Sequence, residues 1–167
     1  MEIRLAEPDD AEAIRTIYNR EVLSSAHTLD LRERSPEEHR AWMDARSGAH
    51  AVIVAVVDGE IAGFGSLSAY RDRPGYTSTV EDSVYVAPGH QGAGVGRKLL
   101  TTLVEVATRH GFHSVMARIV AGHEASLALH RGLGFELVGV EREVGRKFGR
   151  WIDVCLLQLL LSRTPSP

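Results

Sequence analysis

The segment from Val84 to Leu100 constrains the fold more than any other part of this 167-residue chain. It starts as an apolar strand pattern, passes through alternate glycines at 92–96, and continues as an amphipathic helix pattern. Glycine lets the backbone approach a ligand closely, and successive N–H groups at a helix N-terminus attract anions. Arg97 and Lys98 add positive charge there. The pattern predicts a strand, a turn that binds a pyrophosphate, and a helix.

Two common phosphate-binding motifs do not match this turn. A dinucleotide fingerprint starting at Gly92 would need glycine at position 97, where the chain has Arg97. A Walker loop needs Ser or Thr after Gly-Lys, whereas Gly96 is followed by Arg, Lys and Leu. If only the glycines are considered, the alternative is a glycine-rich, flexible helix start that binds no ligand.

The rest of the chain alternates between strand and helix patterns. A capping box at Ser35 and Glu38 starts a helix, and Asp58-Gly59 is a two-residue hairpin turn. We expect helices near 8–22, 35–45, 92–110 and 124–133, and strands near 3–5, 51–57, 60–68, 79–86 and 114–120, with two more within 135–161 around a turn near 145–149. This order predicts an α/β fold, a mixed sheet with helices on both faces. Without a linker or repeat, we expect one domain at 1–162 and a short flexible tail at 163–167.

Composition limits the partners. The 19 basic and 22 acidic residues give a net charge of −3, which argues against a protein that grips nucleic acid. No apolar run approaches the ~18 residues of a membrane span. The single cysteine, Cys155, can form no disulfide within the chain, so we expect a cytoplasmic protein. Cys155 lies in an apolar strand and is predicted to be an inert core thiol.

Several motifs together resemble a known family. Gln91-x-x-Gly94-x-Gly96 after an apolar strand resembles the acetyl-CoA motif of the Gcn5-related N-acetyltransferases (GNAT). The stretches at 79–86 (TVEDSVYV), 129–135 (LHRGLGF) and 142–153 (REVGRKFGRWID) resemble the branch that acetylates phosphinothricin and methionine sulfoximine. The resemblance covers nearly the whole chain. It implies the GNAT fold, with a mixed, mostly antiparallel sheet splayed at the cofactor site, and a homodimer.

The resemblance also implies which residues bind acetyl-CoA. The backbone of the strand would bond the pantetheine arm, and an N–H near Val84 would polarise the acetyl carbonyl. His123 stands where relatives often have an Asn that bonds this arm. Ser126 is one helical turn before His130 and shares its face. The full expected set is Val84, Tyr85, Val86, Gln91, Gly92, Ala93, Gly94, Val95, Gly96, Arg97, His123 and Ser126.

Two residues match catalytic positions of that branch. Direct acetyl transfer needs a base for the ammonium proton, a polarised carbonyl, and stabilisation or protonation of the departing thiolate. Glu81 matches the candidate base, and His130 stands where many relatives place a proton-donating tyrosine. The alternatives are a solvent-facing strand glutamate and a structural or substrate-orienting histidine. The other histidines have no ligand spacing, and we predict no metal.

The acceptor site is expected near a basic, aromatic loop. The branch acts on small α-amino acids and glutamate-like analogues, whose carboxylate a guanidinium can clamp. Arg73 fits the branch's Arg-x-x-Tyr spacing with Tyr76, and Arg71 is the other candidate; a solvated loop charge is the alternative. Leu29, where relatives often have Phe, is expected to wall the pocket.

The last motif contains Lys147, Phe148, Arg150 and Trp151. The resemblance implies a dimer whose shared edge completes the acceptor pocket, as in many relatives, and we expect this segment to contribute to it. For Trp151 we prefer the simpler prediction of packing in the core.

These inferences predict an acetyl-CoA-dependent N-acetyltransferase that acts on a small amino acid or analogue. A peptide or protein N-terminal acetyltransferase is the second hypothesis, and the arginine loop argues against it because a peptide's α-carboxyl is in amide linkage. A non-catalytic acyl-CoA-binding module is the third, and Glu81 and His130 argue against it.

Overall fold

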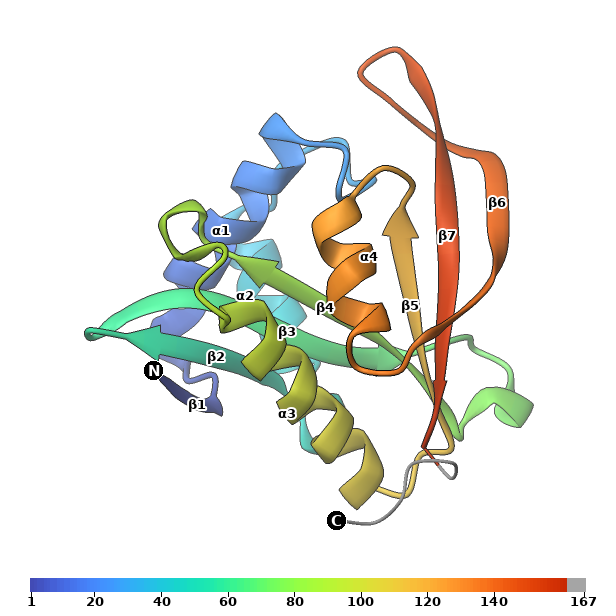
Figure 1. Cartoon of the computed structure of the whole chain (residues 1–167). Helices are drawn as coiled ribbons and strands as arrows, with labels where there is room; N and C mark the ends of the chain where they lie inside the picture. The colour runs from blue at the N-terminus through green and yellow to red at the C-terminus, as the bar shows by residue number, and fades with distance from the viewer. Residues whose placement is uncertain (162–167) are drawn as a thin grey trace.

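The computed structural model describes residues 1–161, which form one seven-stranded sheet with helices on both faces (Figure 1). The predicted flexible tail at 163–167 lies outside the described residues. The helices are α1 (Ala11–Ser24), α2 (Pro36–Asp44), α3 (Val95–Arg109) and α4 (Glu124–Arg131). The strands are β1 (Glu2–Leu5), β2 (Val52–Val57), β3 (Glu60–Ala69), β4 (Thr79–Val86), β5 (Ser114–Val120), β6 (Glu136–Lys147) and β7 (Arg150–Leu160). The predicted α/β fold is confirmed.

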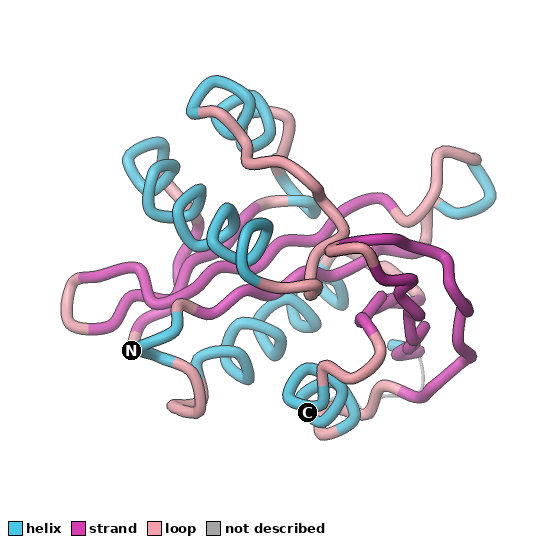
Figure 2. The backbone as a smooth tube through the Cα atoms, turned by 90° about the horizontal axis from the view of Figure 1, so that it is seen from above, coloured by secondary structure: helices cyan, strands magenta, loops and turns pink. Residues whose placement is uncertain are grey.

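The sheet has the strand order β1-β2-β3-β4-β5-β7-β6, and every neighbouring pair is antiparallel except β4 and β5. In the view of the molecule from above, helices lie on both sides of the sheet (Figure 2). The helices α1 and α2 belong to one core, in which Ile14 and Phe64 are buried. The helix α3 packs on the opposite face, where Leu99 and Leu103 meet Val80.

Local chemistry places the element ends close to the predicted positions. The Ser35 Oγ accepts from the Glu38 N–H at 3.2 Å, and a Glu38 carboxylate oxygen accepts from the Ser35 N–H at 2.9 Å, which completes the predicted capping box. Asp58 and Gly59 both have positive φ, 51° and 84°, as the two-residue turn between β2 and β3 requires. Phe148 and Gly149 make the corresponding turn between β6 and β7.

The glycine-rich turn corrects one predicted boundary. The helix was expected from residue 92, but α3 begins at Val95. Gly92 and Gly94 have φ of 76° and 82°, which a right-handed helix does not allow. The three preceding residues therefore form a loop that ends at the helix N-cap, Gly94.

The sheet opens between β4 and β5. The two parallel strands pair only from Thr79 to Glu81, opposite Ser114 to Met116. Beyond this point β4 continues along β3 to Val86, and β5 continues along β7 to Val120. The strands diverge in Figure 1, and α4 lies in front of the gap. The predicted splay is confirmed, and it leaves the β5-facing side of β4 without a strand partner after Glu81.

Two burial predictions have opposite outcomes. Cys155 is buried, as predicted for a core thiol. Trp151 is 60% exposed, so its predicted core packing is wrong. It is the second residue of β7, next to the hairpin tip, and the Arg146 guanidinium lies over its ring. Among residues 1–161, no helix is long and apolar enough to cross a membrane.

Candidate active site

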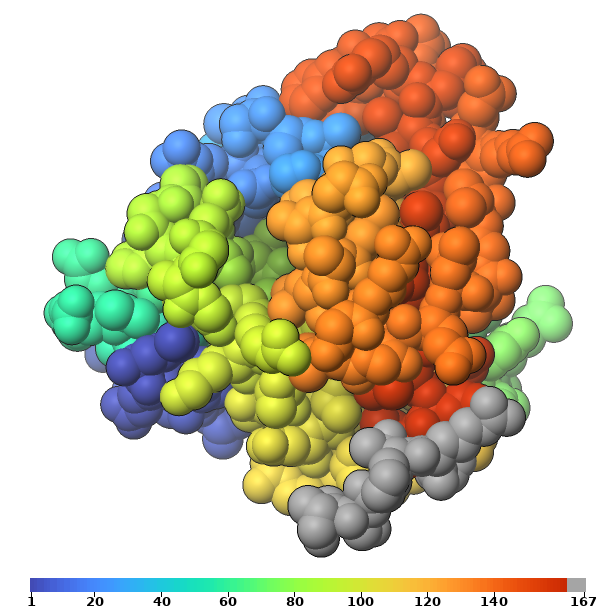
Figure 3. All heavy atoms as spheres, in the orientation of Figure 1, coloured from blue at the N-terminus to red at the C-terminus, as the bar shows by residue number. Residues whose placement is uncertain are grey.

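A cavity of about 610 Å³ fills the opening between β4 and β5. Its walls come from β4, the glycine-rich turn, β5, α4 and the loop after α1. In Figure 3 a hollow lies between the blue α1 loop, the yellow-green turn and the orange α4. Most of the predicted site residues line it: Leu29, Glu81, Val84, Tyr85, Val86, Gln91, Gly92, Gly94, Val95, Gly96, Arg97, His123, Ser126 and His130.

One end of the cavity is built for an anion. The positive φ of Gly92 and Gly94 turns the chain so that the first turn of α3 faces the cavity with free backbone N–H groups. A Cβ on Gly96 would lie 3.3 Å from a Leu129 methyl, so this glycine lets α3 and α4 pack closely. The Arg97 guanidinium donates to the Gly132 carbonyl at 3.2 Å and ties the turn to the end of α4. A pyrophosphate fits this end.

Glu81 lies at the other end of the cavity, where β4 and β5 separate. Its neighbours Val80 and Asp82 point to the α3 and α4 face, so Glu81 points to the face of α1. Burial raises the pKa of Glu81. Arg118 on β5 is the strongest opposing charge, and Asp82 adds to the rise. The shift is in the direction that a base for an ammonium proton needs.

His130 forms a buried pair with Asp82, whose importance the sequence analysis missed. The His130 Nε2 lies 3.0 Å from Asp82 Oδ2, and the two side chains are 4% and 2% exposed. The His130 Nδ1 lies 2.8 Å from the Ser126 carbonyl oxygen and 3.4 Å from the Ser126 hydroxyl. Burial lowers the pKa of His130, but the hydrogen bond and charge of Asp82 and the Ser126 carbonyl outweigh it and raise the pKa overall.

His123 contacts a residue that the sequence did not suggest. Its ring stacks on His27 with centroids 3.6 Å apart, and His27 Nδ1 lies 3.1 Å from a Glu21 carboxylate oxygen. Burial and then the charge of His27 lower the pKa of His123 to about 4, so its ring is neutral at physiological pH. A neutral ring can still bond an amide of a bound ligand.

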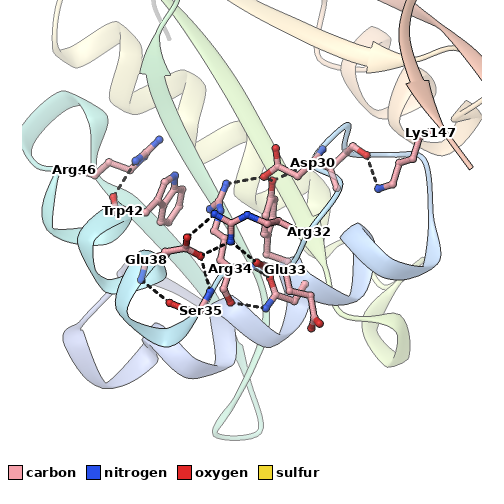
Figure 4. A network of polar contacts seen from close by, with 12 residues as sticks. Asp30, Arg32, Glu33, Arg34, Ser35, Glu38, Trp42, Arg46 and Lys147 are labelled. Atoms are coloured by element: carbon pink, nitrogen blue, oxygen red, sulfur yellow. Dashed lines mark hydrogen bonds and ion pairs between the residues drawn. The ribbon is translucent and has the colours of Figure 1, made fainter.

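The loop between α1 and α2 closes the cavity on the Glu81 side. Lys147 of β6 is buried and donates to the Thr28 carbonyl at 2.8 Å. The Leu29 side chain occupies the space that a Cβ on Gly145 would take, with a methyl 2.6 Å from that position. Figure 4 shows Lys147 at one end of this loop and the Arg34 and Arg46 side chains around Trp42 at the other. Both ends of the loop are therefore fixed, and Leu29 lines the cavity.

Four predicted residues lie outside the cavity wall: Ala93, Arg71, Arg73 and Tyr76. All four are exposed. The Arg71 guanidinium lies over the Tyr70 ring, and its charge reaches Glu81, whose pKa it lowers. The guanidinium that does line this end is Arg118, which pairs with Glu141 at 2.7 Å. Sequence reasoning missed Arg118 because one charge in a strand pattern carries no signal of which face it occupies.

Within the described part of the chain, no group of three or more His, Cys, Asp or Glu residues could hold a metal ion. The phosphate-binding turn and the exposed β4 backbone instead suit a phosphorylated cofactor with an extended arm.

Comparison with known proteins agrees with this geometry. The acetyltransferase (GNAT) domain family matches residues 3–156. An L-methionine sulfoximine/L-methionine sulfone acetyltransferase of Salmonella typhimurium is 40% identical, over 100% of this chain and 98% of its own. A phosphinothricin acetyltransferase from Sinorhizobium meliloti, solved with acetyl-CoA, is 35% identical with a TM-score of 0.93, over 99% and 92% of the two chains. A ribosomal-protein-alanine N-acetyltransferase from Brucella melitensis is 37% identical with a TM-score of 0.94, over 96% and 99%.

A sheet split beside a phosphate-binding turn, with a carboxylate at the split, defines an acyl-CoA-dependent transferase. The chain belongs to the GNAT acetyltransferase family. It is an N-acetyltransferase, and acetyl-CoA is its acetyl donor.

Proposed function

We propose that this enzyme acetylates the α-amine of a small free amino acid or analogue, of the methionine sulfoximine or phosphinothricin type. The observation that carries the proposal is the closed acceptor end of the cavity. Leu29 and Thr28 wall it, and Lys147 and Gly145 of β6 hold that wall in place. A compact acceptor fits beside Glu81 under this loop, whereas an extended peptide would have to displace it.

Different residues of the cavity have different roles in the proposed reaction. The turn from Gln91 to Arg97 holds the pyrophosphate, and the backbone of β4 on its open side, away from β3, holds the arm. An N–H near Val84 polarises the thioester carbonyl. Glu81 takes a proton from the incoming ammonium, directly or through water. His130, in the cavity wall, acts on the departing thiolate, by its charge or by giving a proton.

Arg71 or Arg73 is proposed to bind the acceptor carboxylate. Both lie outside the wall of this single chain, but the charge of Arg71 reaches Glu81. Their exposed loop directly precedes β4, the strand that carries Glu81.

We also propose a homodimer formed through β6, in the cytoplasm, with residues 1–162 as one catalytic domain. β6 is an edge strand, and large apolar side chains are exposed along it and at the adjacent turn. These are Leu137, Val138, Val140, Val144, Phe148 and Trp151. Exposed apolar groups along an unpaired edge are typical of an interaction surface.

Peptide or protein N-terminal acetylation is the second candidate, and the name of the Brucella melitensis relative favours it. An acceptor panel separates the two: thiol release from acetyl-CoA is measured with methionine sulfoximine, methionine sulfone, phosphinothricin, common amino acids, carboxylate-free amines and short peptides. We expect turnover with the free amino acids and analogues. Turnover with peptides alone would establish the second candidate. Binding of acetyl-CoA without turnover on any acceptor would instead support a non-catalytic module.

A further inference from the structure

The Asp82–His130 pair is buried and yet lies in the wall of the cavity. Asp82 comes from β4 and His130 from α4, so the pair also bridges the open edge of the sheet. Asp82 Oδ1 is buried and has no hydrogen-bond partner within residues 1–161. Acetyl transfer as proposed involves His130 but not Asp82.

Both ring nitrogens of His130 face oxygen atoms that accept hydrogen bonds. A backbone carbonyl can only accept, so Nδ1 carries a proton and donates it to the Ser126 carbonyl. An ionised Asp82 also only accepts, so Nε2 donates to it as well. A ring that donates from both nitrogens is an imidazolium, and the raised pKa of His130 agrees with this state.

Within residues 1–161, Asp82 is the one charged group that shifts the pKa of His130. Phe135 packs edge-on against it with centroids 5.0 Å apart. His123, at the start of the same helix, is a second histidine in the cavity wall. It is neutral because burial lowers its own pKa to about 4. Without Asp82, burial would lower the pKa of His130, and of the groups that raise it only the hydrogen bond to the Ser126 carbonyl would remain.

The position of the pair relates it to the leaving group. A cofactor whose pyrophosphate lies at the glycine-rich turn and whose arm follows β4 brings its sulfur to the opposite end of the cavity. Glu81 and the Asp82–His130 pair lie at that end. When the acceptor nitrogen bonds to the acetyl carbon and the C–S bond breaks, the electron pair stays on sulfur, and the ammonium proton leaves through Glu81 to water.

We propose that Asp82 is a positioning residue that holds His130 as an imidazolium, so that its positive charge stabilises the CoA thiolate as it departs. This inference goes beyond the proposed acceptor and rests on the proposed role of His130. A purely structural pair, which only ties α4 to β4, is the alternative.

The decisive measurement is the acidity of the thiol of bound CoA, titrated by its ultraviolet thiolate absorbance in wild type and in Asp82→Asn. Asparagine has the same shape and removes the charge. We expect the variant to raise the pKa of the bound thiol by about one unit or more and to lower kcat about tenfold, with little change in KM. Imidazole ¹⁵N shifts should change from a doubly protonated ring to a neutral one. Asp44→Asn, an exposed site on α2, is the matched control.

The effect should require His130. In a His130→Gln background, Asp82→Asn should shift the thiol pKa no further, because the group through which Asp82 acts is gone. An unchanged thiol pKa in Asp82→Asn, even with a lower melting temperature, would overturn the proposal in favour of the structural pair. A lower thiol pKa would overturn it too, since the carboxylate would then be the dominant charge on sulfur.

If Asp82→Asn does not fold, His130→Gln alone decides: a thiol pKa equal to that of wild type overturns the proposal. The titration uses CoA without an acceptor, so it succeeds or fails independently of which amine is acetylated. The acceptor panel reports on the proposed function separately.

Discussion

Glu81 is proposed to take a proton from an ammonium group, although a free glutamate, with a pKa of about 4.3, is far too acidic for that task. Burial at the end of the cavity raises its pKa and narrows the difference. Glu81→Gln keeps the shape and removes the base, so we expect kcat to fall by about 10²- to 10⁴-fold while acetyl-CoA still binds. Steady-state kinetics and calorimetry measure the two effects. Glu60→Gln, exposed at the start of β3, is the control, and an unimpaired Glu81→Gln enzyme would exclude Glu81 as the base.

The charges around Glu81 predict a pH effect with a definite sign. Arg118 favours the ionised carboxylate and Glu141 disfavours it. Arg118→Leu should therefore raise the pKa of Glu81 further and move the acidic limb of kcat/KM to higher pH, by about one unit. Glu141→Gln should move that limb to lower pH, because it removes a negative charge and frees Arg118 from its partner.

The pH profiles of these two variants are compared with that of Arg109→Leu, an exposed arginine at the end of α3 that should leave the limb unchanged. If Arg118→Leu and Glu141→Gln both moved the acidic limb of kcat/KM in the same direction, the titration of Glu81 would not be the cause of that limb.

At the scale of the elements, the position of the loop after α1 depends on the absence of a side chain at Gly145 of β6. A Cβ on Gly145 would lie 2.6 Å from a Leu29 methyl, whereas a Cβ on Gly139 of the same strand meets nothing within 4 Å. Gly145→Ala should push Leu29 out of place and raise KM for the acceptor roughly tenfold or more, because overpacking costs about 1–3 kcal/mol. The affinity for acetyl-CoA, whose proposed site is the turn and β4, should not change.

Gly139→Ala is the matched control on the same strand, and it should keep the KM of wild type. Equal acceptor kinetics in the two variants would show that the contact between Leu29 and Gly145 does not shape the acceptor site.

At the scale of the whole molecule, the two edges of the sheet differ. The β6 edge exposes a row of apolar side chains, whereas the other edge strand, β1, exposes Leu5. Val140→Lys combined with Val144→Lys should convert a dimer into a monomer, because two charges would have to be desolvated at the interface. Sedimentation velocity measures the change. Leu5→Lys should remain a dimer, and a wild-type monomer at micromolar concentration would contradict the proposal.

The elements themselves could be predicted from the sequence because their causes are local. Each local feature fixes the backbone over only a few residues. Examples are the positive φ at Asp58-Gly59, the capping box at Ser35 and the glycines of the turn. The start of α3 was misplaced by three residues because both a helix start and a left-handed turn can begin with glycine. The exposure of Trp151 was mispredicted because an aromatic residue in a strand pattern does not reveal whether its face is covered.

The sequence by itself determined the strand–turn–helix unit, the order of the elements, and through their motifs the family, since backbone conformation and phosphate binding depend on neighbouring residues. Only the tertiary structure decided which side chains meet. His130 pairs with Asp82 across 48 positions, and Lys147 reaches Thr28 across 119. Arg118 enters the cavity because β5 leaves β4 after three paired residues. The charge states of Glu81 and His130 depend on burial and on such distant partners, and neither is a property of a short stretch of chain.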